Sequence, residues 1–408
     1  MSTPSRPTPS PTTAERSSLW RDSSLSTLTA GFIAVLIGYS SSAAIIVQAA
    51  EAAGASQAEI GSWLWALGIG SGVTTLVFSL RYRMPLLTAW STPGAALLAT
   101  SLPGLPMSEA IGAFLFSSLL ITLCGVTGLF ERLMHRLPRA LASAMLAGVL
   151  LRFGLDLVMT VEHRLVLPLA MGLTYLVTKR LWPRYAIPLV LAVGGLVAQA
   201  QGLLDLGAIT PALAVPAYTA PSFDLGTLIG VGIPLFVVTM ASQNLPGVAA
   251  LRAAGYQPPI SPLVGGTGLA GLALAPFGGF ALNLAAISAA VCQGPEAHRD
   301  PQRRYAAGVA AGGFYLLLGL FGATVSSLFA ALPGELVVAI AGLALLPTLG
   351  ASLADALGDA TQRDAALLTF LVTASGIAPG GIGSAFWGLV AGLVALTIGR
   401  WRAASNVT

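Results

Sequence analysis

Polar residues in three short stretches interrupt otherwise apolar sequence, and their types suit the binding of a small anion. The stretches read AWSTPG at 89–94, MASQNLP at 240–246 and PFGGFALNLAA at 276–286. Pro93 removes a backbone donor and Gly94 loosens the chain, so residues 89–94 are expected to break a helix. A helix that restarts after Pro93 would point free N–H groups and about half a positive charge into the protein. Such an end can bind an anion without a buried Lys or Arg.

The composition assigns these stretches to an integral membrane protein. Of the 408 residues, 55% are hydrophobic and 9% are charged, whereas a typical soluble domain has about 25% charged residues. A bilayer core of about 30 Å requires about 20 apolar residues per helix. We expect about fourteen spans, near residues 24–50, 58–80, 84–102, 107–130, 137–156, 165–180, 185–203, 225–251, 258–275, 277–293, 304–331, 334–353, 364–377 and 380–399.

The basic residues predict the orientation of these spans. If both termini are cytoplasmic, the 20 Lys and Arg residues all fall on the inner side except Arg152 and Arg164, as the positive-inside rule requires. Residues 1–23, rich in Pro, Ser and Thr, are expected to be a disordered cytoplasmic tail, and residues 401–408 a second cytoplasmic tail. The preference for Arg over Lys and the many alanines suggest a GC-rich bacterial genome, and we expect the protein in the bacterial cytoplasmic (inner) membrane. Because the basic residues report topology, no nucleic-acid partner is expected.

Chemistry other than transport finds little support in the sequence. The histidines, His135, His163 and His298, are far apart and lie in predicted loops. Cys124 and Cys292 fall inside apolar segments and have no partner at metal-ligand spacing. No catalytic or nucleotide-binding motif occurs in a suitable context. We therefore expect no enzyme activity, no metal and no cofactor.

The polar stretches recur in the two halves of the chain. YSSSAA (39–44) in the first span corresponds to MASQNL (240–245) in the eighth. An odd number of spans per half inverts the second half, so residues 24–203 and 225–400 are expected to be two inverted seven-span repeats. This is the plan of a secondary transporter whose site lies near the midplane.

The third and tenth spans are the expected broken pair. Matching the AA pairs at 95–96 and 285–286 sets Trp90 opposite Phe280 and Pro93 opposite Asn283, with the second break at Gly278-Gly279-Phe280. Either break alone is more simply explained as a packing kink, but breaks at corresponding places in both halves favour two helix N-termini that face each other.

These residues resemble the benzoate/proton symporters of the BenE type, within a wider group of seven-plus-seven inverted-repeat permeases for nucleobases, ascorbate and sulfate. The resemblance covers about residues 24–400 and is carried by TAWSTPGAAL in the third span, ASQNLPG in the eighth and GGFALNLAAISAA in the tenth. It implies an all-α polytopic fold in which the third and tenth spans are short extended segments followed by half helices. A core domain (spans 1–4 and 8–11) and a gate domain (spans 5–7 and 12–14) would enclose the substrate.

The resemblance implies uptake of benzoate, or a similar aromatic carboxylate, with protons by alternating access, and a possible homodimer. Benzoate has a planar apolar ring and one carboxylate, so its pocket needs apolar walls and a few donors at one end. The predicted substrate-binding residues are Tyr39, Ser41, Ser42, Trp90, Ser91, Thr92, Gly94, Gln243, Asn244, Gly279, Phe280 and Asn283. The alternative for the serines is a bond back to helix carbonyls, and for Trp90 it is helix packing.

The proton carrier and the coupling stay open. Nucleobase permeases carry acidic residues in the eighth and tenth spans, whereas no Asp or Glu falls at the centre of either span here. This disfavours a nucleobase and fits an anion, which a carboxylate would repel. The candidate carriers are Glu51, Asp156, Asp355, Asp359 and the carboxyl group of the substrate. A passive channel or exchanger for small anions is the alternative function, and a nucleobase permease is less favoured.

Overall fold

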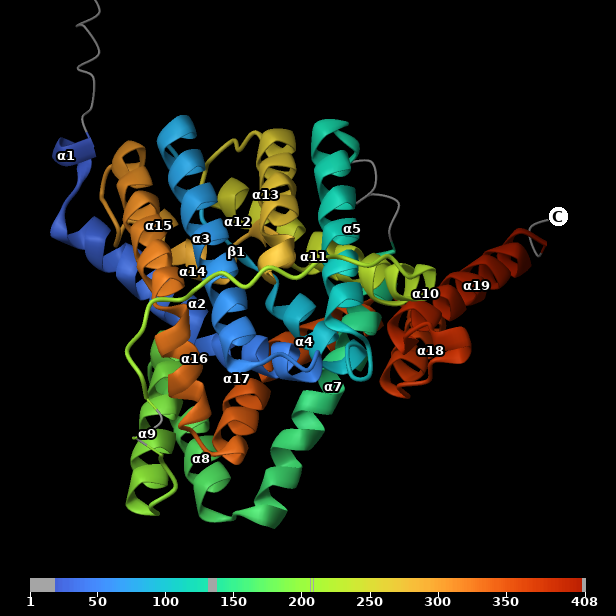
Figure 1. Ribbon diagram of the computed structural model, residues 1–408. Coiled ribbons are helices and arrows are strands. Elements are labelled where there is room, and N and C mark those ends of the chain that lie inside the picture. Colours follow the sequence, from blue (N-terminus) through green and yellow to red (C-terminus); the bar gives the residue numbers. More distant parts are fainter. Residues whose placement is uncertain (1–18, 131–137, 206, 208, 406–408) are drawn as a thin grey trace, which may run out of the picture.

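The structure is a computed structural model that describes residues 19–130, 138–205, 207 and 209–405 of the chain. Figure 1 shows α15, α3, α13 and α5 side by side, with α7, α8, α9 and α17 in the lower part of the view. The first half contains α1 (Leu19–Asp22), α2 (Leu25–Ala52), α3 (Gln57–Tyr82), β1 (Thr88–Trp90), α4 (Thr92–Ser101), α5 (Met107–Val126), α7 (Arg139–His163), α8 (Val166–Leu181), η1 (Pro183–Tyr185) and α9 (Ala186–Ala200).

The second half is built from a similar order of elements. It contains α10 (Leu225–Thr227), η3 (Leu228–Gly232), α11 (Ile233–Thr239), η4 (Met240–Asn244), α12 (Leu245–Ala253), α13 (Ile260–Leu274), η5 (Ala275–Phe277), β2 (Leu282–Leu284), α14 (Ile287–Gln293), η6 (Pro301–Arg303), α15 (Tyr305–Leu320), α16 (Gly322–Ala330), α17 (Gly334–Gly358), α18 (Arg363–Ala374), η7 (Pro379–Gly381) and α19 (Ser384–Ser405). Of these, η3 and η4 are π-helical turns within the eighth span.

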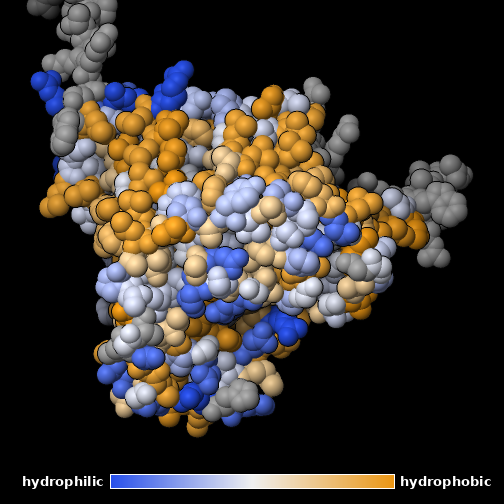
Figure 2. Space-filling view, in the orientation of Figure 1, coloured by the Kyte–Doolittle hydropathy of each residue, from blue (hydrophilic) through white to orange (hydrophobic). Residues whose placement is uncertain are grey.

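The predicted spans all coincide with helical segments in the described ranges, and the third and tenth are broken as expected. Seven of the described helices are long and apolar enough to cross a membrane alone, and an eighth span results if the bent α15–α16 pair counts as one. The other spans are shorter or interrupted. Apolar side chains cover much of the face seen in Figure 2, as expected for a surface in contact with lipid.

Helix packing separates the spans into two groups, which we call the core group and the gate group. In the core group α3 packs on α15 and α5 packs on α13, with β1 and β2 between them. In the gate group α7 packs on α17, α8 on α9 and α18 on α19. Pairs from one half recur as the corresponding pairs of the other half, as an inverted repeat requires. The predicted fold of two inverted seven-span repeats is confirmed.

Hydroxyl groups on α3 satisfy the extended backbone of the third span. The Thr88 N–H donates to Thr75 Oγ1 at 2.9 Å, and the Leu86 N–H donates to Ser79 Oγ at 3.3 Å. A lipid-embedded chain has no water to replace these partners, so a broken span is stable only where the protein supplies them. The threonines and serines of α3 therefore permit the break that Pro93 imposes.

The two breaks meet in one antiparallel ladder. Ala89 lies opposite Asn283 and Trp90 lies opposite Leu282. Ala89 and Asn283 are the central residues of the two three-residue strands. Superposing the strands on these two residues makes Trp90 correspond to Leu284 in the other half, so the alignment that matched Trp90 with Phe280 was wrong by four residues. The second helix accordingly restarts at Ile287, several residues after the predicted break at Gly278–Phe280. The error arose because AA pairs were matched, whereas the repeat is aligned by its strands.

An extended segment, residues 209–224, joins the halves across the outer face of the core group (Figure 1). The Ala212 N–H donates to Thr324 Oγ1 on α16 and the Ala217 N–H donates to Ser62 Oγ on α3, both at 2.9 Å. Since these hydroxyls replace a sheet partner, the segment is held along the core group without secondary structure of its own.

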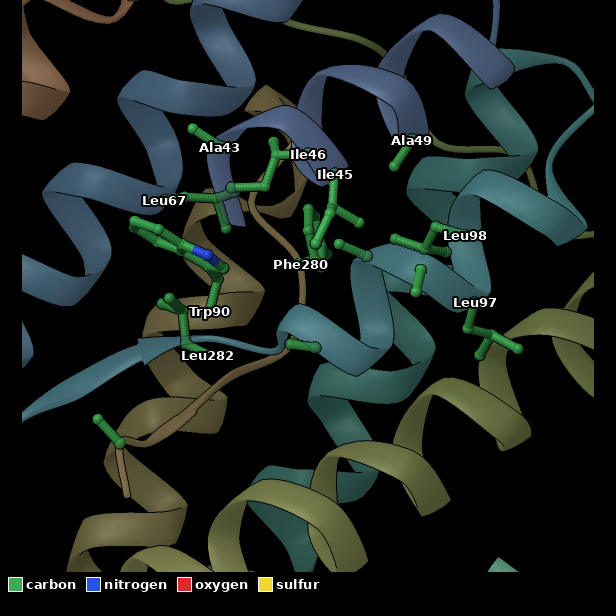
Figure 3. Close-up of a cluster of buried hydrophobic side chains, with 14 of the residues drawn as sticks. Ala43, Ile45, Ile46, Ala49, Leu67, Trp90, Leu97, Leu98, Phe280 and Leu282 are labelled. Carbon is green, nitrogen blue, oxygen red and sulfur yellow. The ribbon is translucent and has the colours of Figure 1, made fainter. Parts of the chain in front are cut away.

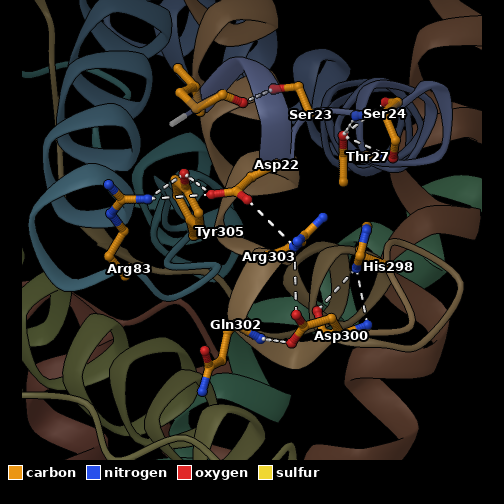
Figure 4. Close-up of polar contacts among 11 residues, drawn as sticks. Asp22, Ser23, Ser24, Thr27, Arg83, His298, Asp300, Gln302, Arg303 and Tyr305 are labelled. Atoms are coloured by element: carbon orange, nitrogen blue, oxygen red, sulfur yellow. Dashed lines mark hydrogen bonds and ion pairs between the residues drawn. The ribbon is translucent and has the colours of Figure 1, made fainter. Parts of the chain in front are cut away.

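A polar cluster fastens α1 to the cytoplasmic ends of α3 and α15 (Figure 4). Asp22 is only 2% exposed. Its carboxylate lies 3.5 Å from both Arg83 and Arg303 and accepts a hydrogen bond from the Tyr305 hydroxyl at 2.8 Å. Residues 19–22, at the end of the segment expected to be a disordered tail, are therefore ordered by this cluster. Residues 1–18 and 406–408 of the predicted tails lie outside the described part.

Candidate substrate-binding site

A cavity of about 770 Å³ lies between the core group and the gate group, beside the crossing of the broken spans. Its volume falls in the range of small-molecule sites, about 300–1,000 Å³. The lining comes from mid-membrane and from cytoplasmic halves of helices, including Ile187 in the first turn of α9, Val291 near the end of α14 and Ala351 in the second half of α17. With the basic loops in the cytoplasm, the cavity faces the cytoplasmic side.

Trp90 forms the aromatic wall of the cavity on the core side. Its ring meets Tyr39 and Tyr315 edge to face, with centroids 5.2 and 5.8 Å away. Its Nε1–H donates to Ser42 Oγ at 2.8 Å, and the Ser42 hydroxyl donates to the Gly38 carbonyl at 2.6 Å. The ring is thus fixed in one orientation, and Ser42 uses its own donor to hold it there.

Thr92, Ser242 and Gln243 bring polar groups to the same wall. Thr92 begins α4, whereas Ser242 and Gln243 belong to η4, a π-helical turn of the kind that is frequent at functional sites. Within the described part of the chain, none of these three side chains has a hydrogen-bond partner. Polar groups that lack a protein partner are available to a ligand or to water.

The half helices present different N-termini to the cavity. On α4 the Ser91 hydroxyl accepts from the Gly94 N–H at 3.0 Å and Pro93 has no N–H, so of the described first-turn donors only Thr92 keeps a free one. On α14 no described side chain caps the helix, and Ala286 and Ser288 line the cavity. The expected donor at Gly94 is therefore occupied by the cap of its own helix.

The structure brings some of the predicted site residues to the cavity and leaves others outside it. Ser42, Trp90, Thr92 and Gln243 line it. Buried outside the lining are Tyr39, Ser91, Gly94, Asn244 and Asn283.

Two predicted residues lie in the packed interior of the core group. Phe280 contacts Trp63 edge-on and Phe114 in a tilted arrangement, and it points toward Ile45 in Figure 3. Gly279 packs on Leu274. The side chain of Ser41 lies outside what the structure describes.

Asn244 holds the tenth span in place from the eighth. Its Oδ1 accepts a hydrogen bond from the Leu284 N–H at 3.0 Å, and its Nδ2 lies 3.2 Å from Met240 Sδ. Both Asn244 and Asn283 are fully buried. The amide at 244 therefore fixes the end of β2, from which the chain turns into the cavity wall at Ala285 and Ala286.

A family model described as benzoate membrane transport protein matches residues 21–398. The chain belongs to this family. It is 40% identical over 380 residues to the benzoate membrane transport protein of Acinetobacter baylyi, covering 93% of this chain and 96% of that one. It is also 52% identical over 372 residues to inner membrane protein YdcO of Escherichia coli, covering 91% and 95%. It is thus a multi-pass inner membrane transport protein and not an enzyme.

Two solved structures with the same fold are described as a bicarbonate transporter and an anion transporter. The transmembrane domain of the cyanobacterial bicarbonate transporter BicA matches with a TM-score of 0.55 at 14% identity, covering 90% of this chain and 97% of that one. The inward-facing murine Solute Carrier 26 family member A9 matches with a TM-score of 0.59 at 14% identity, covering 92% and 68%. At these identities the likeness shows the fold alone.

The gate side of the transporter's cavity was missed by the sequence analysis. It is formed by residues such as Ile187, Ala344 and Thr348, which are ordinary in membrane helices. The one available signal was Pro347, a proline within the twelfth span. On the core side, Ser242 and Ser288 were missed although each is close in sequence to a predicted residue.

None of the described residues that line the cavity carries a charged side chain. The candidate proton carriers Glu51, Asp156, Asp355 and Asp359 are all exposed and lie outside that lining. Hydrogen bonds from the Thr361 hydroxyl and N–H lower the pKa of Asp359 below its usual value. A carrier needs a pKa near the working pH, so Asp359 is poorly suited to this role.

Proposed function

We propose that this transporter imports benzoate, or a closely similar aromatic carboxylate, together with protons by alternating access. The observation that carries the proposal is the make-up of the cavity, in which unpaired polar groups at Thr92, Ser242 and Gln243 adjoin the fixed aromatic face of Trp90. An apolar ring with one carboxylate needs this combination. Family membership and the named function of the Acinetobacter relative support the choice of benzoate.

In the proposed complex the carboxylate accepts hydrogen bonds from the core wall. The donors are the Gln243 amide, the hydroxyls of Thr92 and Ser242, and the free N–H groups at the start of α14. Hydrogen bonds to a charged group contribute about 1.5–3 kcal/mol each. Neutral donors suit a transporter because they bind an anion and still allow its release, whereas a buried Lys or Arg would hold it more tightly.

Alternating access follows from the position of the cavity between two separately packed groups. The polar lining belongs mostly to the core group, so the substrate stays with that group while the core and gate groups slide past each other. The cavity faces the cytoplasm in this arrangement, which is then the state that releases the substrate inside the cell.

Transport by purified protein in liposomes tests the proposal. Radiolabelled benzoate uptake is measured with and without an inward proton gradient, with protein-free liposomes as the control for diffusion of benzoic acid. We expect gradient-dependent accumulation above equilibrium that excess salicylate inhibits and that uracil and sulfate do not. Equilibration without accumulation would instead indicate a passive pathway, and competition by uracil or sulfate would contradict the substrate assignment.

A further inference from the structure

The gate wall of the cavity is almost entirely apolar. It is formed by the start of α9, including Ile187 and Pro188, and by one face of α17, where Ala344, Thr348 and Ala351 follow one another at helical spacing. Among the described residues of this wall, Thr348 alone carries a side-chain group that can form hydrogen bonds. The polar groups of the core wall lie across the cavity from it.

The Thr348 hydroxyl differs from most helical threonines of the gate group, and also from Thr373 on α18, whose unpaired hydroxyl is buried outside the cavity lining. Thr174 and Thr178 on α8 donate back to the carbonyls of Ala170 and Thr174, at 2.7 and 2.6 Å. Threonine hydroxyls in apolar helices commonly form such hydrogen bonds to the preceding turn. Thr348 makes no hydrogen bond within the described part of the chain, and its side chain faces the cavity. Its hydroxyl is therefore open to whatever occupies the cavity.

We propose that Thr348 is a specificity-determining residue that hydrogen-bonds a hydroxyl group on the substrate ring, so that the site takes ring-hydroxylated benzoates. This inference rests on the proposed function, because it needs the carboxylate to be held on the core wall. With the carboxylate there, the far side of the ring faces α17. A hydroxyl at the 3- or 4-position then meets Thr348 in a wall that is otherwise apolar, whereas benzoate leaves Thr348 without a partner.

The position of the ring hydroxyl supplies an internal control. In 2-hydroxybenzoate the hydroxyl lies next to the carboxylate and stays with it near the core wall. Loss of the Thr348 hydroxyl should therefore weaken binding of one or both of the 3- and 4-hydroxy compounds, and leave benzoate and 2-hydroxybenzoate unaffected.

Equilibrium binding to the full-length protein in lipid nanodiscs tests the inference. Kd values of the four compounds are measured by calorimetry for wild type, Thr348→Val, Thr348→Ser and Thr397→Val. Thr348→Val keeps the shape of the side chain and removes its hydroxyl, and Thr348→Ser restores a hydroxyl. Thr397→Val makes the same change on an exposed face of α19, where the hydroxyl only bonds back to Val394.

We expect Thr348→Val to raise the Kd of the 3- or 4-hydroxy compound about fivefold, which corresponds to the loss of a net hydrogen bond of about 1 kcal/mol. Benzoate and 2-hydroxybenzoate should change less than about twofold, Thr348→Ser should retain most of the affinity, and Thr397→Val should match wild type. An equal loss of affinity for all four compounds, or no loss for any of them, would overturn the inference about Thr348. Benzoate binding by wild type would still uphold the proposed function in that case. Failure of folded wild type to bind any of them would overturn both.

Discussion

The two broken spans meet in one ladder, yet they satisfy their backbones differently. Apart from its backbone bonds to the tenth span, the third span is supplied by side chains close to it in sequence, because Thr75 on α3 accepts from Thr88 and Ser91 caps α4. The tenth span depends on a partner from far along the chain, since Asn244 accepts from Leu284. It then enters α14 without a described side-chain cap.

This difference assigns the halves different roles. A capped helix end has few donors left for a ligand, whereas an uncapped end beside a cavity keeps them. The third span therefore contributes chiefly the aromatic wall at Trp90, and the tenth contributes open backbone donors near Ala286. An inverted repeat of the backbone thus yields a site with two chemically distinct sides.

A charge at the open end of α14 is expected to have the largest effect. Ala286→Asp places a carboxylate in the cavity, where it repels a bound anion by about 1–4 kcal/mol at contact distance. Benzoate affinity should fall at least about fivefold relative to Ala286→Asn, which has the same size without the charge. Thermal unfolding should be similar in the two variants, since an acidic residue is favourable at a helix N-terminus. Calorimetric titration checks this, and equal affinities would place the anion elsewhere.

The matching pair at α4 sharpens the comparison. Thr92→Asp and Thr92→Asn make the same contrast at the capped helix. We expect the ratio of the benzoate Kd of the Asp variant to that of the Asn variant to be smaller at Thr92 than at Ala286. The anion is held less closely to α4, because α4 offers one free N–H in its described first turn. A larger ratio at Thr92 than at Ala286 would reverse the roles assigned to the two breaks.

Removing the remote partner of the tenth span should have the next largest effect. Asn244→Leu leaves the buried Leu284 N–H unpaired, which costs about 1–3 kcal/mol of stability. Thr75→Val does the same to the Thr88 N–H of the third span and is the matched control. Both should lower the unfolding temperature, but only Asn244→Leu should also weaken benzoate binding severalfold. Unfolding monitored by fluorescence and binding by calorimetry separate the two effects, and equal binding by both variants would contradict a positioning role for Asn244.

The sequence was sufficient for the spans and the breaks, but insufficient for the register between them. Long apolar runs, basic loops and the Pro93–Gly94 pair each have a direct physical meaning along the chain. The strand pairing does not, because Ala89 and Asn283 are brought together by helices that pack elsewhere. Phe280 was accordingly expected in the site, whereas its ring fills the interior of the core group. The gate wall was missed because alanine and isoleucine at its positions look like any lipid-facing residue.

A moderate effect is expected when the indole of Trp90 loses its donor. Trp90→Phe keeps an aromatic ring against the substrate and removes the hydrogen bond to Ser42. Losing one net hydrogen bond of about 1 kcal/mol lets the ring change orientation, so benzoate affinity should fall by about fivefold or less. Ser42→Ala removes the same bond from the other side and should give a similar loss by calorimetry. Unequal losses would indicate that the Ser42 hydroxyl, or the part of the indole that phenylalanine lacks, contacts the substrate directly.

The smallest effect on binding is expected at the cap of α4. Ser91→Ala frees the Gly94 N–H and costs about 1 kcal/mol of helix stability. Because Ser91 is fully buried outside the cavity lining, benzoate affinity should stay within about twofold of wild type while the unfolding temperature falls. If affinity instead rises clearly, the freed N–H has become a donor to the anion. The Ser91 cap would then be all that keeps the third span from donating a backbone hydrogen bond to the anion. The chemical difference between the two breaks would therefore be caused by Ser91.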